Sequence, residues 1–241
     1  MSSESPPTLL SEECGKLLDA LLSNDSTTKK KLKAVRNHCM ALLMLEAGLR
    51  VGELVSLRLS NLYFNRQPVR TIIIKPHMTK NKVEHHVPVS DRLSESLAAY
   101  GKTWPLIQDF VGSHFAFTSV RTDRQITTRQ VERIICAAGW KALGRPVHPH
   151  VLRHTCASRL MRVTNSSTVQ EILGHKYLSS TQIYCHPNED DKRQAIDSAS
   201  QTAKPAEPCQ QQQPRPELPA EPVNPGPVPA SPLFSPVKSR W

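Results

Sequence analysis

A change of composition toward the C-terminus limits which part of this chain can fold. Eleven of the twenty prolines lie between residues 205 and 236, beside the glutamine run 210–213. Such a segment cannot bury enough apolar surface to offset the conformational entropy lost on ordering. We therefore expect residues 201–241 to form a disordered Pro/Gln-rich tail and residues 1–8 a disordered N-terminus. One folded domain is expected across residues 9–200, an ordinary length for a single domain.

Most apolar side chains of the expected domain recur at the 3.6-residue spacing of helices. Ser11 is followed by two acids, which is typical of a helix start with Ser11 as its N-cap. Gly48 and Gly174 are typical C-terminal stops. Further helices are predicted to include residues 35–45, 50–57, 93–100, 127–143, 149–161, 169–173, a short segment around Tyr184, and 187–199.

Extended structure is predicted in only two places. The β-branched run 69–75 and the alternating segment 82–89 predict a hairpin with its turn at residues 79–81. Residues 115–118 predict one more short strand. The sequence shows neither βαβ alternation nor a glycine-rich phosphate loop. The expected fold class is therefore mainly α with a small antiparallel β-sheet, an α+β fold.

Nearly all of the positive charge lies in the expected domain. The chain carries a net charge of +10, and residues 201–241 hold four bases and three acids, so about +9 belongs to residues 1–200. This excess favours a polyanionic partner such as double-stranded DNA. Lys29, Lys30 and Lys31 are candidates for contacts with the DNA backbone, or for a face that simply meets water.

The cysteines indicate neither a metal site nor a disulfide framework. No two of them form a Cys-x-x-Cys pair, and their spacing is irregular, at positions 14, 39, 136, 156, 185 and 209. We expect reduced thiols in a cytoplasmic, DNA-associated protein. The N-terminus is polar and acidic and predicts no signal peptide, and the longest apolar run is too short to span a bilayer. No membrane partner is expected.

Three separated segments carry side chains suited to attack on a phosphodiester. They are Gly-Leu-Arg-Val-Gly-Glu-Leu at residues 48–54, His-Val-Leu-Arg-His-Thr at 150–155, and Leu-Gly-His at 173–175 with Tyr184 nine residues after His175. Arginine forks bind phosphate oxygens and keep their charge. A tyrosine with a pKa near 10 needs a nearby base or cations to act as a nucleophile. No motif clusters acids as metal enzymes do, so neither a metal nor a cofactor is expected.

These three motifs, in this order, resemble those of the tyrosine recombinase (phage integrase) family. The resemblance implies a fold like the catalytic domain of that family. It implies that Arg50 and Arg153 bind the scissile phosphate and that His175 donates a hydrogen bond to it. By the same likeness His150 acts as the base, and Tyr184 attacks to leave a 3′-phosphotyrosine and a free 5′-hydroxyl.

The resemblance also implies a lysine acid in a hairpin turn, which protonates the leaving 5′-oxygen. Lys80, eight residues before Pro88, matches the usual place of that lysine, and Lys82 is its rival. Glu53 resembles the supporting acid of the family, and His154 resembles its additional histidine.

The chain departs from the family pattern at its N-terminus. Most members carry a helical core-binding domain before the catalytic one, but only about thirty residues precede the second predicted helix here. The chain therefore resembles a catalytic-domain-only member of a mobile genetic element, acting in integration, excision or inversion. The family likeness implies a homotetramer on paired sites, assembled through the helix at 187–199. A type IB-like topoisomerase and a non-catalytic DNA-binding module are the alternatives.

Neither a nucleophile nor a metal site is predicted among the remaining tyrosines and histidines. Tyr63 and Tyr100 lie beside apolar residues and are expected to pack in the core, and Tyr177 is too close to His175 to serve as the nucleophile. Five histidines lack metal-ligand spacing to acids or thiols, and we attribute them to chance or to DNA-facing polarity: His77, His85, His86, His148 and His186.

Overall fold

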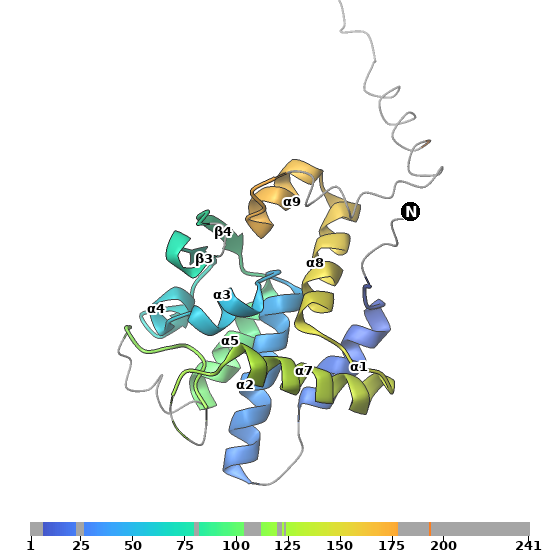
Figure 1. The fold of residues 1–241 in the computed structure, drawn as a ribbon. Coiled ribbons are helices and arrows are strands. Elements are labelled where there is room, and N and C mark those ends of the chain that lie inside the picture. Colours follow the sequence, from blue (N-terminus) through green and yellow to red (C-terminus); the bar gives the residue numbers. More distant parts are fainter. Residues whose placement is uncertain are drawn as a thin grey trace, which may run out of the picture. The chain divides into compact units, whose positions relative to one another are not determined.

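The computed structural model describes residues 7–22, 27–79, 82–103, 112–119, 122, 124–177 and 193 (Figure 1). The chain divides into two compact units, Met1–Asn188 and Glu189–Trp241. In the second unit the described part is Arg193 alone, which is helical and exposed. The predicted helix around Tyr184, the rest of the predicted helix at 187–199, and the predicted tail lie outside the described residues.

The described part of the first unit is mainly helical. Its helices are α1 (Ser11–Leu21), α2 (Thr28–Leu45), α3 (Val51–Ser56), α4 (Leu59–Leu62), α5 (Asp91–Thr103), α7 (Thr128–Leu143), α8 (Pro149–Val163), α9 (Ser166–Leu173) and the 3-10 turn η1 (Pro76–Met78). Its strands are β1 (Tyr63–Phe64), β2 (Gln67–Pro68), β3 (Thr71–Ile74) and β4 (His85–Pro88). The predicted class, mainly α with antiparallel β-structure as the smaller part, is confirmed.

The expected hairpin is present, with β3 and β4 antiparallel and Ile72 opposite Val87. The prediction of a single sheet is wrong, because β1 and β2 form a second two-stranded sheet. Asn65 and Arg66 connect those strands with positive φ angles of 49° and 63°, as a tight hairpin turn requires. Residues 115–118 make only isolated bridges rather than a strand.

Side-chain hydrogen bonds cap the N-terminal ends of α7 and α1. At α7 the Thr127 hydroxyl accepts a hydrogen bond from the Gln130 amide at 3.2 Å, and the Gln130 side chain accepts from the Thr127 amide at 2.9 Å. This reciprocal pair satisfies two amides that the helix leaves unpaired. At α1 the predicted cap is wrong, because Ser11 is the first helical residue and the Glu13 carboxylate accepts from the Leu10 amide.

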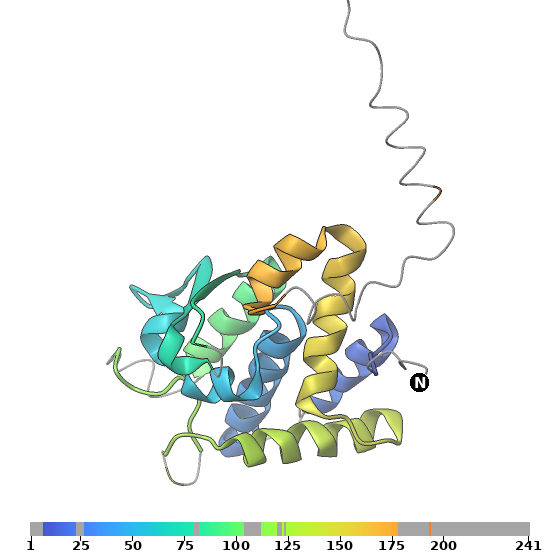
Figure 2. The same ribbon diagram turned by 45° about the horizontal axis from the view of Figure 1, so that its top comes forward.

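Helix α2 forms the centre of the core. Every residue from Cys39 to Leu45 is at most 2% exposed, because α1, α3, α5 and α8 all contact this helix. Figures 1 and 2 show α3 and α8 near the C-terminal end of α2, with β4 and α9 packed against each other close by. The core therefore brings segments from both halves of the domain to one end of α2.

Hydrogen bonds from two buried tyrosines connect α5 to neighbouring segments. The Tyr63 hydroxyl donates to the Leu97 carbonyl at 2.8 Å, and the Tyr100 hydroxyl donates to the Ala116 carbonyl at 2.7 Å. Burial raises the pKa of both phenols well above the usual value. The expectation that Tyr63 and Tyr100 pack in the core is confirmed.

We expect Tyr63→Phe to lower the free energy of unfolding by about 1 kcal/mol, because the ring remains while its buried hydrogen bond is lost. Urea unfolding followed by circular dichroism measures this change. Tyr177→Phe, at a side chain that is 61% exposed, is the matched control and should leave stability unchanged. Equal stability of the two variants would contradict the structural role of the Tyr63 hydroxyl.

Candidate active site

The centre of the candidate site is the buried carboxylate of Glu53. Arg50 is the N-cap residue of α3, and Glu53 is the third residue of that helix. The Glu53 carboxylate accepts from the Arg50 amide at 2.8 Å and from the Arg50 guanidinium at 2.7 Å. The acid that follows the arginine by three residues therefore both caps the helix and orients the arginine side chain.

A second guanidinium reaches the same carboxylate from α8. Arg153 Nη1 lies 3.8 Å from Glu53 Oε2, and the Arg153 side chain is 6% exposed. Arg153 also donates to the carbonyls of Gly48 and Leu173, the latter at 2.9 Å. These contacts fix the plane of the guanidinium and join the turn before α3 to the end of α9.

Two glycines in the left-handed conformation allow these segments to approach. Gly48 has φ +62° and Gly174 has φ +60°, a region that side chains rarely adopt. A Cβ at Gly48 would overlap the Leu173 side chain, and one at Gly174 would lie closer than 3.0 Å to three atoms of the His85 ring. Both predicted helix stops therefore also serve as close contacts between distant segments.

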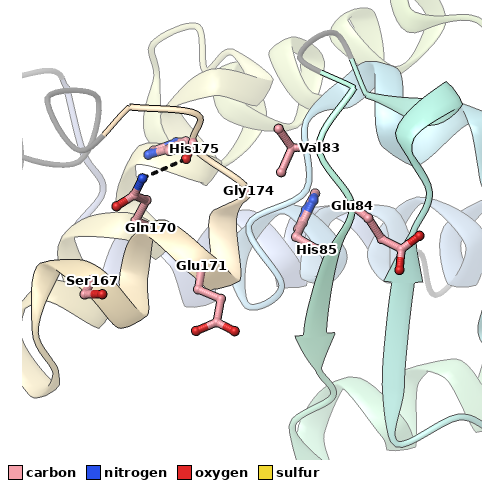
Figure 3. A pocket seen from close by; sticks show the side chains of 8 residues that line it. All are labelled: Val83, Glu84, His85, Ser167, Gln170, Glu171, Gly174 and His175. Carbon is pink, nitrogen blue, oxygen red and sulfur yellow. Dashed lines mark hydrogen bonds between the residues drawn. The ribbon is translucent and has the colours of Figure 1, made fainter.

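His175 follows Gly174 and is held through its backbone. Its amide donates to the Gln170 carbonyl at 3.0 Å, and the Gln170 side chain donates to the His175 carbonyl at 3.1 Å (Figure 3). Burial, followed by the charges of Arg153 and Arg50 and the nearby His85 and His154, lowers the pKa of His175 to about 4. The imidazole is therefore neutral near pH 7 and can donate one hydrogen bond to a phosphate oxygen.

The two histidines of α8 lie at the edge of this cluster. Their ring centroids are 6.4 Å apart. His150 is exposed in the first turn of α8, whereas His154 is partly buried. Burial lowers the pKa of His154, and the charges of His150 and Arg153 add to that effect. His150 is therefore accessible from solvent, and its role as the base stays a prediction.

One residue of the site was missed by the sequence interpretation. His85, in β4, is 4% exposed and lines a pocket of about 280 Å³ with His175, Gly174 and Gln170 (Figure 3). The expectation that His85 provides DNA-facing polarity is wrong, because its side chain is buried. A signal was available, because burial alternates along β4 and His85 shares the inward face with Val87.

Residues 8–191 match the model of the phage integrase family. The chain belongs to the phage integrase family. It is 32% identical over 182 residues to the tyrosine recombinase XerC of Azotobacter vinelandii, across 75% of this chain and 56% of that protein. The chain thus spans little more than half the length of that curated relative.

Solved structures show the same fold. The crystal structure of the XerA recombinase superposes with a TM-score of 0.62 at 26% identity, covering 81% of this chain and 66% of that chain. The XerH site-specific recombinase bound to its difH substrate has a TM-score of 0.59 at 25% identity, covering 81% of this chain and 55% of that chain. The predicted family membership is confirmed.

The structure of this phage integrase family member brings together Arg50, Glu53, Arg153 and His175, with His154 beside them. Lys80 and Tyr184 lie outside the described residues, so their roles stay predictions. Lys82, at the start of the segment leading into β4, is exposed and has a positive φ of 52°.

The lysines at 29–31 are exposed in the first turn of α2. At 1.5 Å per residue they lie about 20 Å along the helix from its C-terminal end beside the site. They are not part of the cluster, and their contact with DNA stays a prediction. Among the described residues, no helix is long and apolar enough to cross a bilayer and no three potential ligands are grouped to hold a metal ion.

The lowered pKa of His175 predicts how stability depends on pH. In the unfolded chain the imidazole titrates near the ordinary histidine pKa of about 6.5, but in the fold its pKa is about 4. The unfolded chain therefore binds the proton first, and stability should fall as the pH drops from about 6.5 toward about 4. Urea unfolding at about pH 7 and about pH 5 should show a smaller fall for His175→Asn than for the wild type. A fall in His175→Asn equal to that of the wild type would contradict the assignment.

Proposed function

We propose that this chain cuts and rejoins double-stranded DNA as a site-specific recombinase, through a covalent 3′-phosphotyrosine at Tyr184. The observation that carries the proposal is the convergence of three distant segments: Arg50 and Arg153 meet at the buried Glu53, and His175 lies close to both arginines. The family match and the similarity to a recombinase solved on its DNA substrate support it. The positive charge of residues 1–200 suits a DNA partner.

The charges of the cluster suit one phosphodiester. Two guanidinium groups and one carboxylate leave one net positive charge, and the neutral imidazole of His175 adds a donor without adding charge. Arg50 and Arg153 are positioned to bind the nonbridging oxygens, where negative charge increases in the transition state. Donors held in advance at such a position lower the barrier by about 3–4 kcal/mol each.

In the proposed cleavage step the Tyr184 hydroxyl attacks the phosphorus as His150 accepts its proton. The bond from phosphorus to the 5′-oxygen breaks, and Lys80 gives that oxygen a proton. Religation runs the same steps in reverse with a new 5′-hydroxyl. One phosphodiester is exchanged for another, so the step needs no energy source and no cofactor.

We further propose that the working assembly is a homotetramer on paired sites, joined through the C-terminal helix at 187–199, and associated with DNA in the cytoplasm. The support is the family likeness stated above. The domain limits 9–200 and 201–241 are proposed on the composition change, and the family match at 8–191 is consistent with the first of them.

A nicked suicide duplex that carries the protein's own site tests the strand chemistry. The wild type should form a covalent protein–DNA adduct on a denaturing gel, and Tyr184→Phe should form none because it lacks the nucleophile. Tyr177→Phe, seven residues away and exposed, is the matched control and should form the adduct. Absence of a wild-type adduct, or an adduct with Tyr184→Phe, would refute the mechanism. Relaxation of supercoils without a paired site would instead favour a topoisomerase.

Substitution of each hairpin lysine identifies the acid. With normal DNA, Lys80→Ala should slow adduct formation by about 100- to 10,000-fold, as expected for loss of a general acid. A 5′-phosphorothiolate strand has a leaving group that needs no proton, so it should restore the rate of Lys80→Ala. Lys82→Ala is the comparison variant and should show no such restoration. Restoration confined to Lys82→Ala would assign the acid to Lys82.

A further inference from the structure

His85 is a polar residue in a position that an apolar side chain would normally fill. It faces inward from β4 beside Val87, while His86 and Pro88 face outward. Both ring nitrogens of His85 are buried and without a hydrogen-bond partner among the described residues. Buried polar atoms in folded proteins are nearly always paired, and an exception calls for an explanation.

The ring lies directly against the segment that carries His175. Three ring atoms lie so close to Gly174 that no Cβ fits between them. Figure 3 shows His85 on β4 beside the turn at Gly174, and both residues line one pocket with His175. The hairpin strand and the His175 turn therefore touch through one imidazole and one glycine.

The surroundings of the ring are those of the proposed active site. Burial is the main influence that lowers the pKa of His85, and Arg153 and Arg50 contribute. The Glu53 carboxylate and the Val83 carbonyl act in the opposite direction. The positive charges of Arg50 and Arg153 therefore act on both His85 and His175.

We propose that His85 is a positioning residue for His175, and this inference rests on the proposed strand-transfer function. Its ring packs against the Gly174–His175 backbone, and one ring nitrogen supplies a hydrogen bond that fixes the His175 imidazole during cleavage. The hairpin that leads from Lys82 into β4 is thereby coupled to the histidine that meets the phosphate. A side chain of the same size without nitrogen would fill the space but lose this coupling.

Variants at position 85 separate polarity from packing. His85→Leu and His85→Phe keep an apolar group in the space, His85→Gln restores a hydrogen-bonding group, and His86→Leu on the exposed face is the matched control. In single-turnover reactions on saturating suicide duplex, the apolar variants should form adduct about 100-fold more slowly, the size of effect expected for a misplaced catalytic group. His85→Gln should recover at least about a tenth of the wild-type rate. DNA affinity should stay within about 2-fold, since His85 is buried.

A spectroscopic readout tests the same inference without the reaction. In protein labelled with 15N-histidine, the ring resonances of His175 should report one dominant tautomer in the wild type and His86→Leu. In His85→Leu they should report a mixture of tautomers, and His85→Phe serves if His85→Leu does not fold.

The outcomes separate the two proposals. Wild-type adduct rates and unchanged His175 resonances in the apolar variants would overturn the positioning role and leave the recombinase function intact. A wild type that forms no adduct would overturn the function, and unchanged His175 resonances in the variants would then overturn the positioning role as well. The positioning role would also be overturned if His85→Gln formed adduct no faster than His85→Leu, because the polarity of the side chain would then have no effect.

Discussion

The buried carboxylate of Glu53 is the interaction on which the rest of the site depends. Two guanidinium groups from different helices lie against it, and one of them is almost completely removed from water. Without the carboxylate these cations would repel each other in a poorly solvated place, and breaking such a buried pair typically costs about 3–5 kcal/mol. With it, the cluster retains one unit of positive charge, the amount that a single phosphodiester neutralises.

Backbone contacts hold this charge arrangement in place. Arg153 donates to carbonyls at Gly48 and Leu173, which are 105 and 20 residues away from it in the sequence. Gln170 holds both backbone groups of His175. Burial near two arginines keeps the His175 imidazole neutral, because protonation would add charge where little solvent remains to stabilise it. The geometry is thus prepared before any substrate binds.

Local signals in the sequence predicted much of the fold. Helix α7 begins after the cap residue Thr127, which pairs with Gln130, and ends before Gly144. Both ends lie within one residue of the predicted range 127–143. The β3–β4 hairpin followed from β-branched and alternating residues. The β1–β2 hairpin was missed because its strands have two residues each and its turn uses Asn65 and Arg66 rather than glycine. The burial of His85 was missed because the residue type suggested polarity and only its place in the alternation suggested the core.

The sequence by itself determined most of the described helices, the hairpin at the candidate site and the set of reactive side chains, because caps, turns and periodicity act over a few residues. It also carried the family motifs. Only the tertiary structure decided that Arg50 and Arg153 share the Glu53 carboxylate with His175 close to both arginines, and that His85 lies against Gly174. Those contacts join segments that are up to about a hundred residues apart, and they depend on how the helices pack around α2, which no local pattern encodes.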